Sequence, residues 1–378
     1  PAISESHKEY TLFKQKGFKV IKRAQALGEI TKSSRAICCA GTHGKTTVSS
    51  MIAHILKQSS VDCNAFLGGI LKNYESNLLL SNKSDITVVE ADEYDRSFHW
   101  LYPWIAIVTS VEPDHLDIYG DEKSYIESFE KFTELVRDDG YLLIKEGVKL
   151  NPSASTIKKY TYSLNEGDFY ADKIHLGKGT LLFDLVYPDG IIKDIDLGVP
   201  LIINVENAVV AAAAAWISGA KPEEIKVALS TYQGAKRRFD LRYKSKKVVF
   251  IDDYAHHPNE LRASIQSIKS LYKDKKITGI FQPHLYSRTR DFAEEFARSL
   301  SLLDELILLD VYPAREEPIE GVSSQLIFDK VQIKDKTLCS KEELLQLMKI
   351  KRPEVLVTFG AGDIETLLVD IEQLLRSM

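Results

Sequence analysis

Short apolar runs alternate with helical patterns along the first part of the chain. The apolar segment 36–40 leads into a glycine-containing loop, and a helical pattern follows from Val48 to Gln58. Further apolar runs typical of buried strands lie at Ile86–Ala91, Ile105–Ser110 and Tyr141–Ile144, with a helical pattern at Lys123–Val136. Strands that alternate with helices predict an α/β fold, with a mainly parallel sheet and helices on its faces.

The pattern changes between residues 159 and 200. Short alternating segments at Lys158–Ser163 and Lys178–Val186 lie near the turn signal Asp189-Gly190, and they predict an antiparallel β excursion at the edge of this domain. The alanine-rich segment Asn207–Ile217 predicts a tightly packed helix, and a second helix opens at Pro222.

A second α/β series begins near Gly234, where we expect a linker. Its candidate strands are Val248–Asp252, Ile277–Gln282, Glu305–Asp310 and Val355–Phe359, and its candidate helices are Asn259–Leu271, Arg290–Leu300 and Ile364–Leu375. The sequence therefore predicts two successive α/β domains.

Composition narrows the classes of partner. The 378 residues carry a net charge of −5, which argues against a general nucleic-acid binder. The apolar run Val209–Ile217 is far shorter than the roughly 20 residues of a membrane helix, so we expect no membrane partner. Four cysteines without metal or redox spacing favour a reducing cytoplasm.

The loop Gly41-Thr42-His43-Gly44-Lys45-Thr46-Thr47 has the composition of a phosphate-binding turn. Backbone N–H groups at a helix N-terminus cradle phosphate oxygens, Lys45 would neutralise the β- and γ-phosphates, and Thr46 would bind Mg²⁺. The pattern departs from the standard loop at Cys39, where a first glycine is usual. We nevertheless predict that this loop binds Mg²⁺-ATP.

Carboxylates follow two of the predicted strands. Glu90 ends one apolar run and is our candidate Mg²⁺ ligand, because hard cations prefer oxygen donors at this edge of a sheet. We interpret Asp95, and also Glu93, as part of a solvated acidic loop. His115, between Asp114 and Asp117, follows the next strand and would reach the same edge.

The second domain carries two polar motifs at strand ends. They are Asp252-Asp253-Tyr254-Ala255-His256-His257-Pro258 and Gln282-Pro283-His284-Leu285-Tyr286-Ser287-Arg288-Thr289-Arg290. The cations of the second motif suit recognition of a carboxylate or phosphate. For Arg290 we prefer a surface ion pair.

Six motifs in order resemble the Mur ligases of bacterial cell-wall synthesis. They are the phosphate loop, Glu90-Ala91-Asp92-Glu93, Asp114-His115-Leu116-Asp117, Lys236-Arg237-Arg238-Phe239-Asp240, the segment 252–258 and Gly360-Ala361-Gly362-Asp363-Ile364. The resemblance covers essentially the whole chain. It implies a central P-loop ATPase domain at 31–233, a C-terminal Rossmann-like domain at 234–378 that binds the amino acid, and a remnant of an N-terminal UDP-binding domain at 1–30. The start at Pro1 leads us to expect a truncated chain that lacks most of that first domain.

The resemblance, closest to the alanine-adding members, also implies an activity. It is the ATP-dependent ligation of L-alanine to the carboxylate of UDP-N-acetylmuramate through an acyl phosphate, in a cytoplasmic monomer or weak homodimer. Residue roles follow by matching motifs. Lys45, Glu90 and His115 would be catalytic; Thr46 and Glu90 would bind the first Mg²⁺ and His115 the second. The loop 41–47, Asn204, Asn207, Arg238 and Asp253 would contact ATP, and His256, His284 and Arg288 the substrates, with Arg288 on the carboxylate of the amino acid.

Two departures from the family pattern affect these roles. Ile203 stands where an adenine-contacting His is usual, and Leu285 where many relatives have Arg. Alternatives are a murein peptide ligase that attaches a recycled peptide to the same sugar nucleotide, a folylpolyglutamate synthetase, and a P-loop kinase or nucleotide switch. A fragment that binds nucleotide without ligating is a further alternative.

Overall fold

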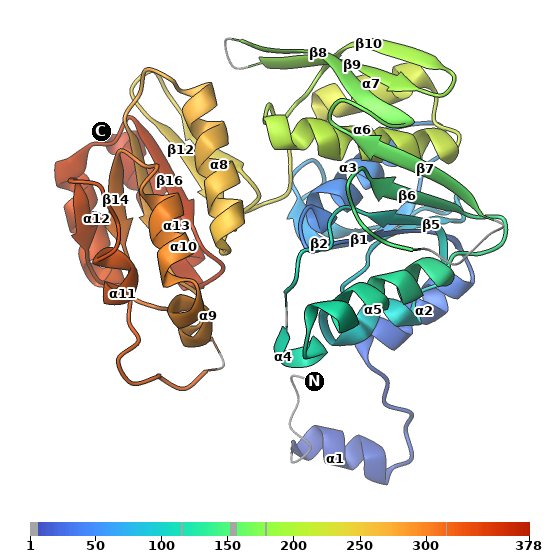
Figure 1. The fold of residues 1–378 in the computed structure, drawn as a ribbon, viewed down its shortest axis with the longest axis horizontal. Helices are drawn as coiled ribbons and strands as arrows, with labels where there is room; N and C mark the ends of the chain where they lie inside the picture. Colours follow the sequence, from blue (N-terminus) through green and yellow to red (C-terminus); the bar gives the residue numbers. More distant parts are fainter. Residues whose placement is uncertain (1–6, 115, 152–156, 178–179, 315) are drawn as a thin grey trace. The chain divides into compact units, whose positions relative to one another are not determined.

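The computed structural model describes residues 7–114, 116–151, 157–177, 180–314 and 316–378. The chain divides into two compact units. The first comprises Pro1–His175, Thr180–Pro200 and Asn204–Gln233, and the second comprises Leu176–Gly179, Leu201–Ile203 and Gly234–Met378. Both units are α/β structures, as predicted, and each is described by itself (Figure 1).

A ten-stranded sheet organises the first unit, in the order β10-β9-β8-β7-β6-β5-β1-β4-β2-β3. At its centre β1 (Arg35–Ala40) pairs in parallel with β4 (Ile86–Glu90) and β5 (Pro103–Val108). On one side β6 (Tyr141–Lys145) is parallel to β5; on the other, β2 (Asn64–Leu71) is parallel to β4 and pairs antiparallel with β3 (Ser76–Leu79). The predicted parallel core of this unit is confirmed.

The segment predicted as an antiparallel excursion extends the same sheet. The hairpin of β9 (Thr180–Tyr187) and β10 (Gly190–Asp196) is antiparallel, as expected. The prediction is wrong for β7 (Lys158–Ser163), which is parallel to β6 and to the start of β8 (Phe169–Gly177). Alternating polarity is the same for either strand direction, so the sequence pattern could not decide between them. Stacking of Tyr160 on Tyr141, with ring planes 8° apart, accompanies the parallel pairing.

Helices cover the first sheet and position the phosphate loop. The 14-residue helix α3 (Lys45–Gln58) follows β1, and α6 (Ile202–Ile217) carries a run of alanines, 211–215, that is completely buried. Helix α5 (Glu122–Glu134) begins at an Asp121 cap and packs Phe129 against Phe98. The remaining elements are α1 (Lys8–Gln15), α2 (Arg23–Lys32), η1 (Tyr94–Trp100), α4 (Leu116–Tyr119) and α7 (Pro222–Thr231).

The second unit has a six-stranded sheet in the order β11-β12-β16-β13-β14-β15. Its strands are β11 (Asp240–Lys244), β12 (Val249–Asp253), β13 (Ile277–Phe281), β14 (Glu305–Leu308), β15 (Lys336–Leu338) and β16 (Val355–Phe359). Only β11 is antiparallel to its neighbour among the pairs described. Because the other strands are parallel to one another, their carboxyl ends all lie at one edge of the sheet.

Two hydrophobic cores lie on the two faces of this second sheet. Along β12, Val249 and Ile251 join the core beneath α8 (Pro258–Leu271) and α10 (Ala293–Leu300), whereas Phe250 joins the opposite core, beneath α12 (Lys341–Lys351) and α13 (Leu368–Ser377). Successive side chains of the strand point to opposite faces of the sheet and therefore contribute to both cores. The short elements are α9 (Tyr286–Asp291), α11 (Gln325–Phe328) and η2 (Asp363–Leu367).

Two predicted helices differ from the observed ones. The predicted helix Arg290–Leu300 is interrupted at Phe292, whose φ of −117° lies outside the helical range, so α9 ends before it and α10 begins after it. The predicted helix Ile364–Leu375 opens with the 3₁₀ turn η2 before α13 begins. Within the described residues, no helix is both long and apolar enough to cross a membrane.

Candidate functional site

The predicted phosphate loop connects β1 to α3 in the first unit. Gly41 has a φ of 137° and Gly44 a φ of 83°, so both adopt backbone conformations that favour glycine. A Cβ on Gly41 would lie 2.0 Å from the Thr109 hydroxyl oxygen. The loop is further held by the end of β5, because the His43 N–H donates to the Ser110 hydroxyl at 3.0 Å.

The start of α3 has the features of an anion site. No side chain caps the helix at Gly44, which leaves the first-turn N–H groups oriented toward the loop. The positive end of a 14-residue helix favours negative charge at this position. The loop therefore offers both the donors and the dipole that phosphate binding requires.

Lys45 forms a buried ion pair with Glu93. The Lys45 ammonium lies 2.8 Å from each carboxylate oxygen of Glu93 and also donates to the Gly41 carbonyl at 2.7 Å. Glu93 is only 2% exposed, and burial raises the pKa of its carboxyl group, although Lys45 opposes that shift. The interpretation of Glu93 as part of a solvated loop is wrong. The residues that contact Glu93 come from other segments, namely Lys45 and Tyr119, whose hydroxyl donates to the Glu93 carbonyl, and nothing in the local sequence marks Glu93.

Thr46 and Glu90 lie together at the end of β4. The Thr46 hydroxyl donates to Glu90 Oε1 at 3.0 Å, and the Gly68 N–H donates to Glu90 Oε2 at 3.1 Å. A Cβ at position 68 would lie 2.1 Å from that second oxygen, so any other residue would displace the carboxylate from this position. Two oxygen donors 3.0 Å apart beside a phosphate loop suit one Mg²⁺ ion. Gly68 was not predicted, because a strand glycine gives no sign of what approaches it.

His115 lies outside the described residues, and the structure does not test its predicted role. The preceding segment lies beside the phosphate loop, because the Thr42 hydroxyl donates to the Glu112 carbonyl at 2.8 Å. Within the part of the chain that the structure describes, no group of three or more His, Cys, Asp or Glu side chains could hold a metal ion. The second Mg²⁺ site therefore stays a prediction.

The two predicted adenine-contacting asparagines lie near the loop, on α6. The Asn207 amide donates to Asn204 Oδ1 at 3.3 Å, and a Cβ on Gly44 would lie 3.2 Å from Asn207 Oδ1. Between them Glu206 pairs with Lys145 at 2.8 Å, a contact that the sequence did not reveal. The first unit thus gathers the loop, Glu90 and both asparagines around the start of α3.

A separate polar cluster lies at the carboxyl edge of the second sheet. Asp253 ends β12 and accepts a hydrogen bond from the Ser264 hydroxyl, and its partial burial raises the pKa of its carboxyl group to about 6. The ring of His256 lies 6.2 Å from that of His284, and burial lowers the pKa of His256. The structure therefore brings together side chains predicted from two separate motifs.

The arginines of this unit divide into two groups. The Arg238 guanidinium lies 5.0 Å from the Tyr254 ring centre, and the positive charge of Arg288 helps to lower the pKa of His256. Arg290 pairs with its exposed neighbour Asp291 at 2.7 Å, and the prediction of a surface ion pair is confirmed. Arg237, given no role by the sequence, pairs with buried Asp252 at 3.2 Å and is structural.

Leu285 holds a strained backbone conformation within this cluster. Its φ of 72° lies in the left-handed region, which is unusual for a residue with a branched side chain. The residue links His284 to helix α9, so the strain lies at the point where the second polar motif turns.

Comparisons with known proteins agree with this arrangement. Residues 39–215 match the Mur ligase middle domain, and residues 237–362 match the Mur ligase, glutamate ligase domain. The chain is 62% identical to a UDP-N-acetylmuramate–L-alanine ligase of Parabacteroides distasonis, over 99% of this chain and 82% of that protein, and 54% identical to the protein of the same name from Phocaeicola vulgatus, over 100% and 82%.

Solved structures agree with the sequence comparisons. A UDP-N-acetylmuramate–alanine ligase from Thermotoga maritima is similar with a TM-score of 0.82 and 25% identity, over 100% of this chain and 83% of that one. A murein peptide ligase from Psychrobacter arcticus shares the fold, with a TM-score of 0.68 and 20% identity over 100% and 85%. The chain belongs to the Mur ligase family.

Proposed function

We propose that this protein is an ATP-dependent ligase that joins L-alanine to the carboxylate of UDP-N-acetylmuramate, a step in the synthesis of peptidoglycan precursors. The observation that carries the proposal is the 62% identity, over 99% of the chain, to a protein named for this reaction. The uncapped phosphate loop with Lys45 and Glu93 supports the ATP-dependent half of the reaction.

The reaction would proceed in two steps. The muramyl carboxylate attacks the γ-phosphorus of ATP, the bond from that phosphorus to ADP breaks, and the products are an acyl phosphate and ADP. The amine of L-alanine then attacks the acyl carbon, and phosphate leaves from a tetrahedral intermediate. The protein contributes mainly alignment and positive charge to the first step.

Lys45 is the central side chain of that first step. Its ammonium is held by Glu93 and by the Gly41 carbonyl, so it is already positioned over the loop. Phosphate oxygens at the start of α3 would compete with Glu93 for this ammonium. Thr46 and Glu90 would hold Mg²⁺, which supplies further charge to the β- and γ-phosphates. His115 would hold a second ion.

The remaining roles follow from the family resemblance. Asn204 and Asn207 would contact adenine, Arg238 and Asp253 would reach the nucleotide, and His256, His284 and Arg288 would contact the substrates. We also propose the division into a segment of the UDP-binding domain at 1–30, an ATP-binding domain at 31–233 and an amino-acid-binding domain at 234–378. A cytoplasmic location and a monomeric or weakly dimeric state belong to the same proposal.

A phosphate-release assay tests this function. The purified chain receives ATP, Mg²⁺, UDP-N-acetylmuramate and a panel containing L-alanine, glycine, L-serine and a tripeptide. We expect the highest turnover with L-alanine, and Lys45→Ala should abolish ADP release. Preference for the tripeptide would instead identify a murein peptide ligase, the activity named for one structural neighbour. Calorimetric binding of ATP without binding of the sugar nucleotide would identify a non-ligating fragment.

A further inference from the structure

The second sheet carries a concentration of positive charge at the edge opposite its polar cluster. Strands β12, β13, β14, β15 and β16 are parallel, so the segments that precede them meet at one edge, together with the end of β11. Backbone hydrogen bonds join these segments directly, from Val249 to Glu354, from Val355 to Lys276 and from Leu306 to Asp335. We call the charged residues at 244–247, 269–276, 304–305, 334–336 and 349–354, which lie in or beside these segments, the basic edge.

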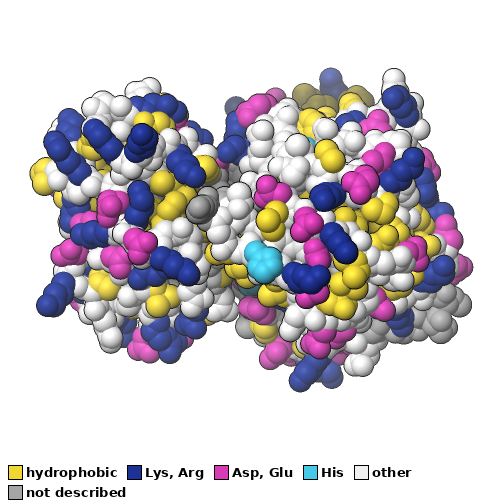
Figure 2. Space-filling view, turned by 90° about the horizontal axis from the view of Figure 1, so that it is seen from above, with side chains coloured by type: hydrophobic (Ala, Val, Ile, Leu, Met, Phe, Trp, Pro, Cys, Tyr) yellow, Lys and Arg dark blue, Asp and Glu magenta, His cyan; other side chains and the backbone are white. Residues whose placement is uncertain are grey.

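The basic edge contains twelve cations and five anions. The cations are Lys244, Lys246, Lys247, Lys269, Lys273, Lys275, Lys276, Lys334, Lys336, Lys349, Lys351 and Arg352, and the anions are Asp274, Asp304, Glu305, Asp335 and Glu354. This edge therefore has a net charge of about +7 in a chain whose total is −5, which leaves about −12 on the rest. Lys and Arg side chains are spread over the visible face of the second unit (Figure 2).

Part of this charge is compensated within the edge, and part projects into solvent. Lys269 pairs with Asp304 at 3.2 Å and Lys276 with Asp335 at 3.0 Å. Lys351 likewise pairs with Glu305. In contrast, the side chains of Lys246, Lys273, Lys334 and Lys349 are exposed.

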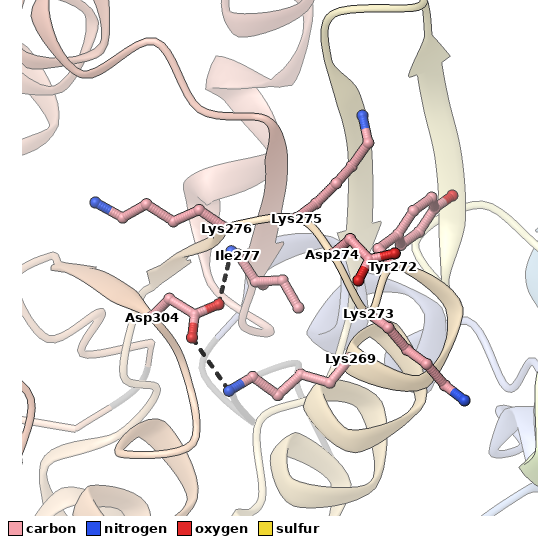
Figure 3. Close-up of a pocket in the computed structure, with 8 residues that line it drawn as sticks. All are labelled: Lys269, Tyr272, Lys273, Asp274, Lys275, Lys276, Ile277 and Asp304. Atoms are coloured by element: carbon pink, nitrogen blue, oxygen red, sulfur yellow. Dashed lines mark hydrogen bonds and ion pairs between the residues drawn. The ribbon is translucent and has the colours of Figure 1, made fainter.

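The lysines around the start of β13 point in different directions. They line an open hollow of about 540 Å³ together with Tyr272 and Asp304. Figure 3 shows the side chains of Lys273, Lys275 and Lys276 spreading apart, while Lys269 turns to Asp304. Ammonium groups that diverge do not enclose one phosphate, so this arrangement suits a broad layer of negative charge.

An exposed apolar side chain lies within the basic edge. Ile350, between Lys349 and Lys351 at the end of α12, is 80% exposed, more than any other large hydrophobic side chain that the structure describes. A bilayer interface accepts both features at once, because lysines meet anionic headgroups while an apolar side chain inserts between lipids. A nucleic acid offers no comparable environment for Ile350.

We propose that the basic edge docks the protein reversibly on an anionic membrane surface. Eleven of the twelve cations are Lys, a point charge without the planar fork that Arg uses for base or phosphate recognition, which also favours a diffuse anionic surface. The acidic remainder of the chain would be repelled by the same surface, so docking would select one orientation. The sequence-based expectation of no membrane partner depended on the short apolar run Val209–Ile217, and the length of an apolar run does not bear on a surface that docks through charge.

Vesicle co-sedimentation of the full chain tests this proposal. We expect binding to vesicles of phosphatidylcholine with 30% phosphatidylglycerol at 50 mM NaCl, no binding to pure phosphatidylcholine, and loss of binding at 500 mM NaCl because salt screens surface charge. The variant K246Q/K273Q/K334Q/K349Q should bind about 100-fold more weakly, since each lysine near an anionic surface contributes appreciably to attraction. Ile350→Ser should weaken binding several-fold.

A matched variant separates the basic edge from total charge. K83Q/K123Q/K131Q/K193Q removes four exposed lysines of the first unit and changes the net charge equally, and it should retain binding to the anionic vesicles. Both variants should keep their circular dichroism spectra and their phosphate-release activity with soluble substrates. Equal loss of binding in both variants would overturn the proposal, as would absence of wild-type binding. Binding to a DNA duplex but not to vesicles would replace the membrane with a nucleic acid.

Discussion

The pair of Lys45 and Glu93 predicts an asymmetric response to mutation. In Lys45→Met the carboxylate of Glu93, which is 2% exposed, loses the cation 2.8 Å from both of its oxygens. A charge pair at that distance is worth about 6 kcal/mol before desolvation at an effective dielectric constant of about 20. Removing one partner of a buried pair typically costs about 3–5 kcal/mol. Lys45 remains 15% exposed, and water can reach its position. We therefore expect Lys45→Met to lower the free energy of unfolding by about 3 kcal/mol at pH 8.

The loss should depend on pH in a defined direction. Burial already raises the pKa of Glu93 above 4.5, and removal of Lys45 raises it further. A carboxyl group with a raised folded-state pKa contributes stability below its unfolded pKa, and that contribution is lost as the pH rises toward the folded value. Lys45→Met should therefore be less destabilising at pH 5 than at pH 8. Glu93→Gln, which resembles the protonated acid, should stay within about 1 kcal/mol of wild type.

Urea unfolding followed by tryptophan fluorescence measures this effect. Trp100, Trp104 and Trp216 are the three tryptophans of the chain, and all lie in the first unit, so the signal reports the unit that contains the pair. The double variant Lys45→Met/Glu93→Gln should be more stable than Lys45→Met alone at pH 8. A Lys45→Met loss that is unchanged between pH 5 and pH 8, or a double variant no more stable than the single one, would refute the reasoning.

Three further predictions concern the metal site, the amino acid and the helix α3. Gly68→Ala places a Cβ 2.1 Å from a Glu90 oxygen. The Mg²⁺ concentration for half-maximal phosphate release should therefore rise at least about tenfold. An unchanged Mg²⁺ requirement would contradict the role of Glu90. Arg288→Ala should raise the KM for L-alanine about 100-fold and the KM for ATP little; equal effects would exclude a carboxylate contact. Burial lowers the pKa of His54 to about 4. The free energy of unfolding should therefore decrease by up to about 3 kcal/mol as the pH falls from about 6.5 toward 4. Urea unfolding of His54→Gln should show a smaller decrease over that range.

The sequence predicted the elements that local pattern and spacing determine. Lys45 and Thr46 were placed correctly beside a strand and a helix because glycine, polarity and an apolar run are all local signals. Glu90 was placed correctly at the end of β4 because an apolar strand ends there. The metal and phosphate roles of these residues stay predictions.

The acidic residues after β4 show where local pattern is insufficient. Glu90, Glu93 and Asp95 lie within six positions, yet Glu90 contacts Thr46, Glu93 is buried against Lys45, and Asp95 forms an exposed pair with Lys22. Their separate environments arise from which distant segment packs on each side chain. Charge density along the sequence is the same for all three, so it could not distinguish a buried carboxylate from a solvated one.

Topology explains both functional surfaces that we assign to the second unit. A parallel sheet sorts residues by their order relative to each strand, so those that follow strands gather at one edge and those that precede strands gather at the other. Asp253 ends β12 and His284 follows β13, and both belong to the polar cluster. Lys246 and Lys273 precede the same strands and belong to the basic edge. Each lysine run is short and unremarkable in the sequence, and only the parallel pairing of the strands adds the runs into one surface. A chain with a net charge of −5 can therefore present a cationic face, and the position of charge relative to strand order is more informative about docking than its sum.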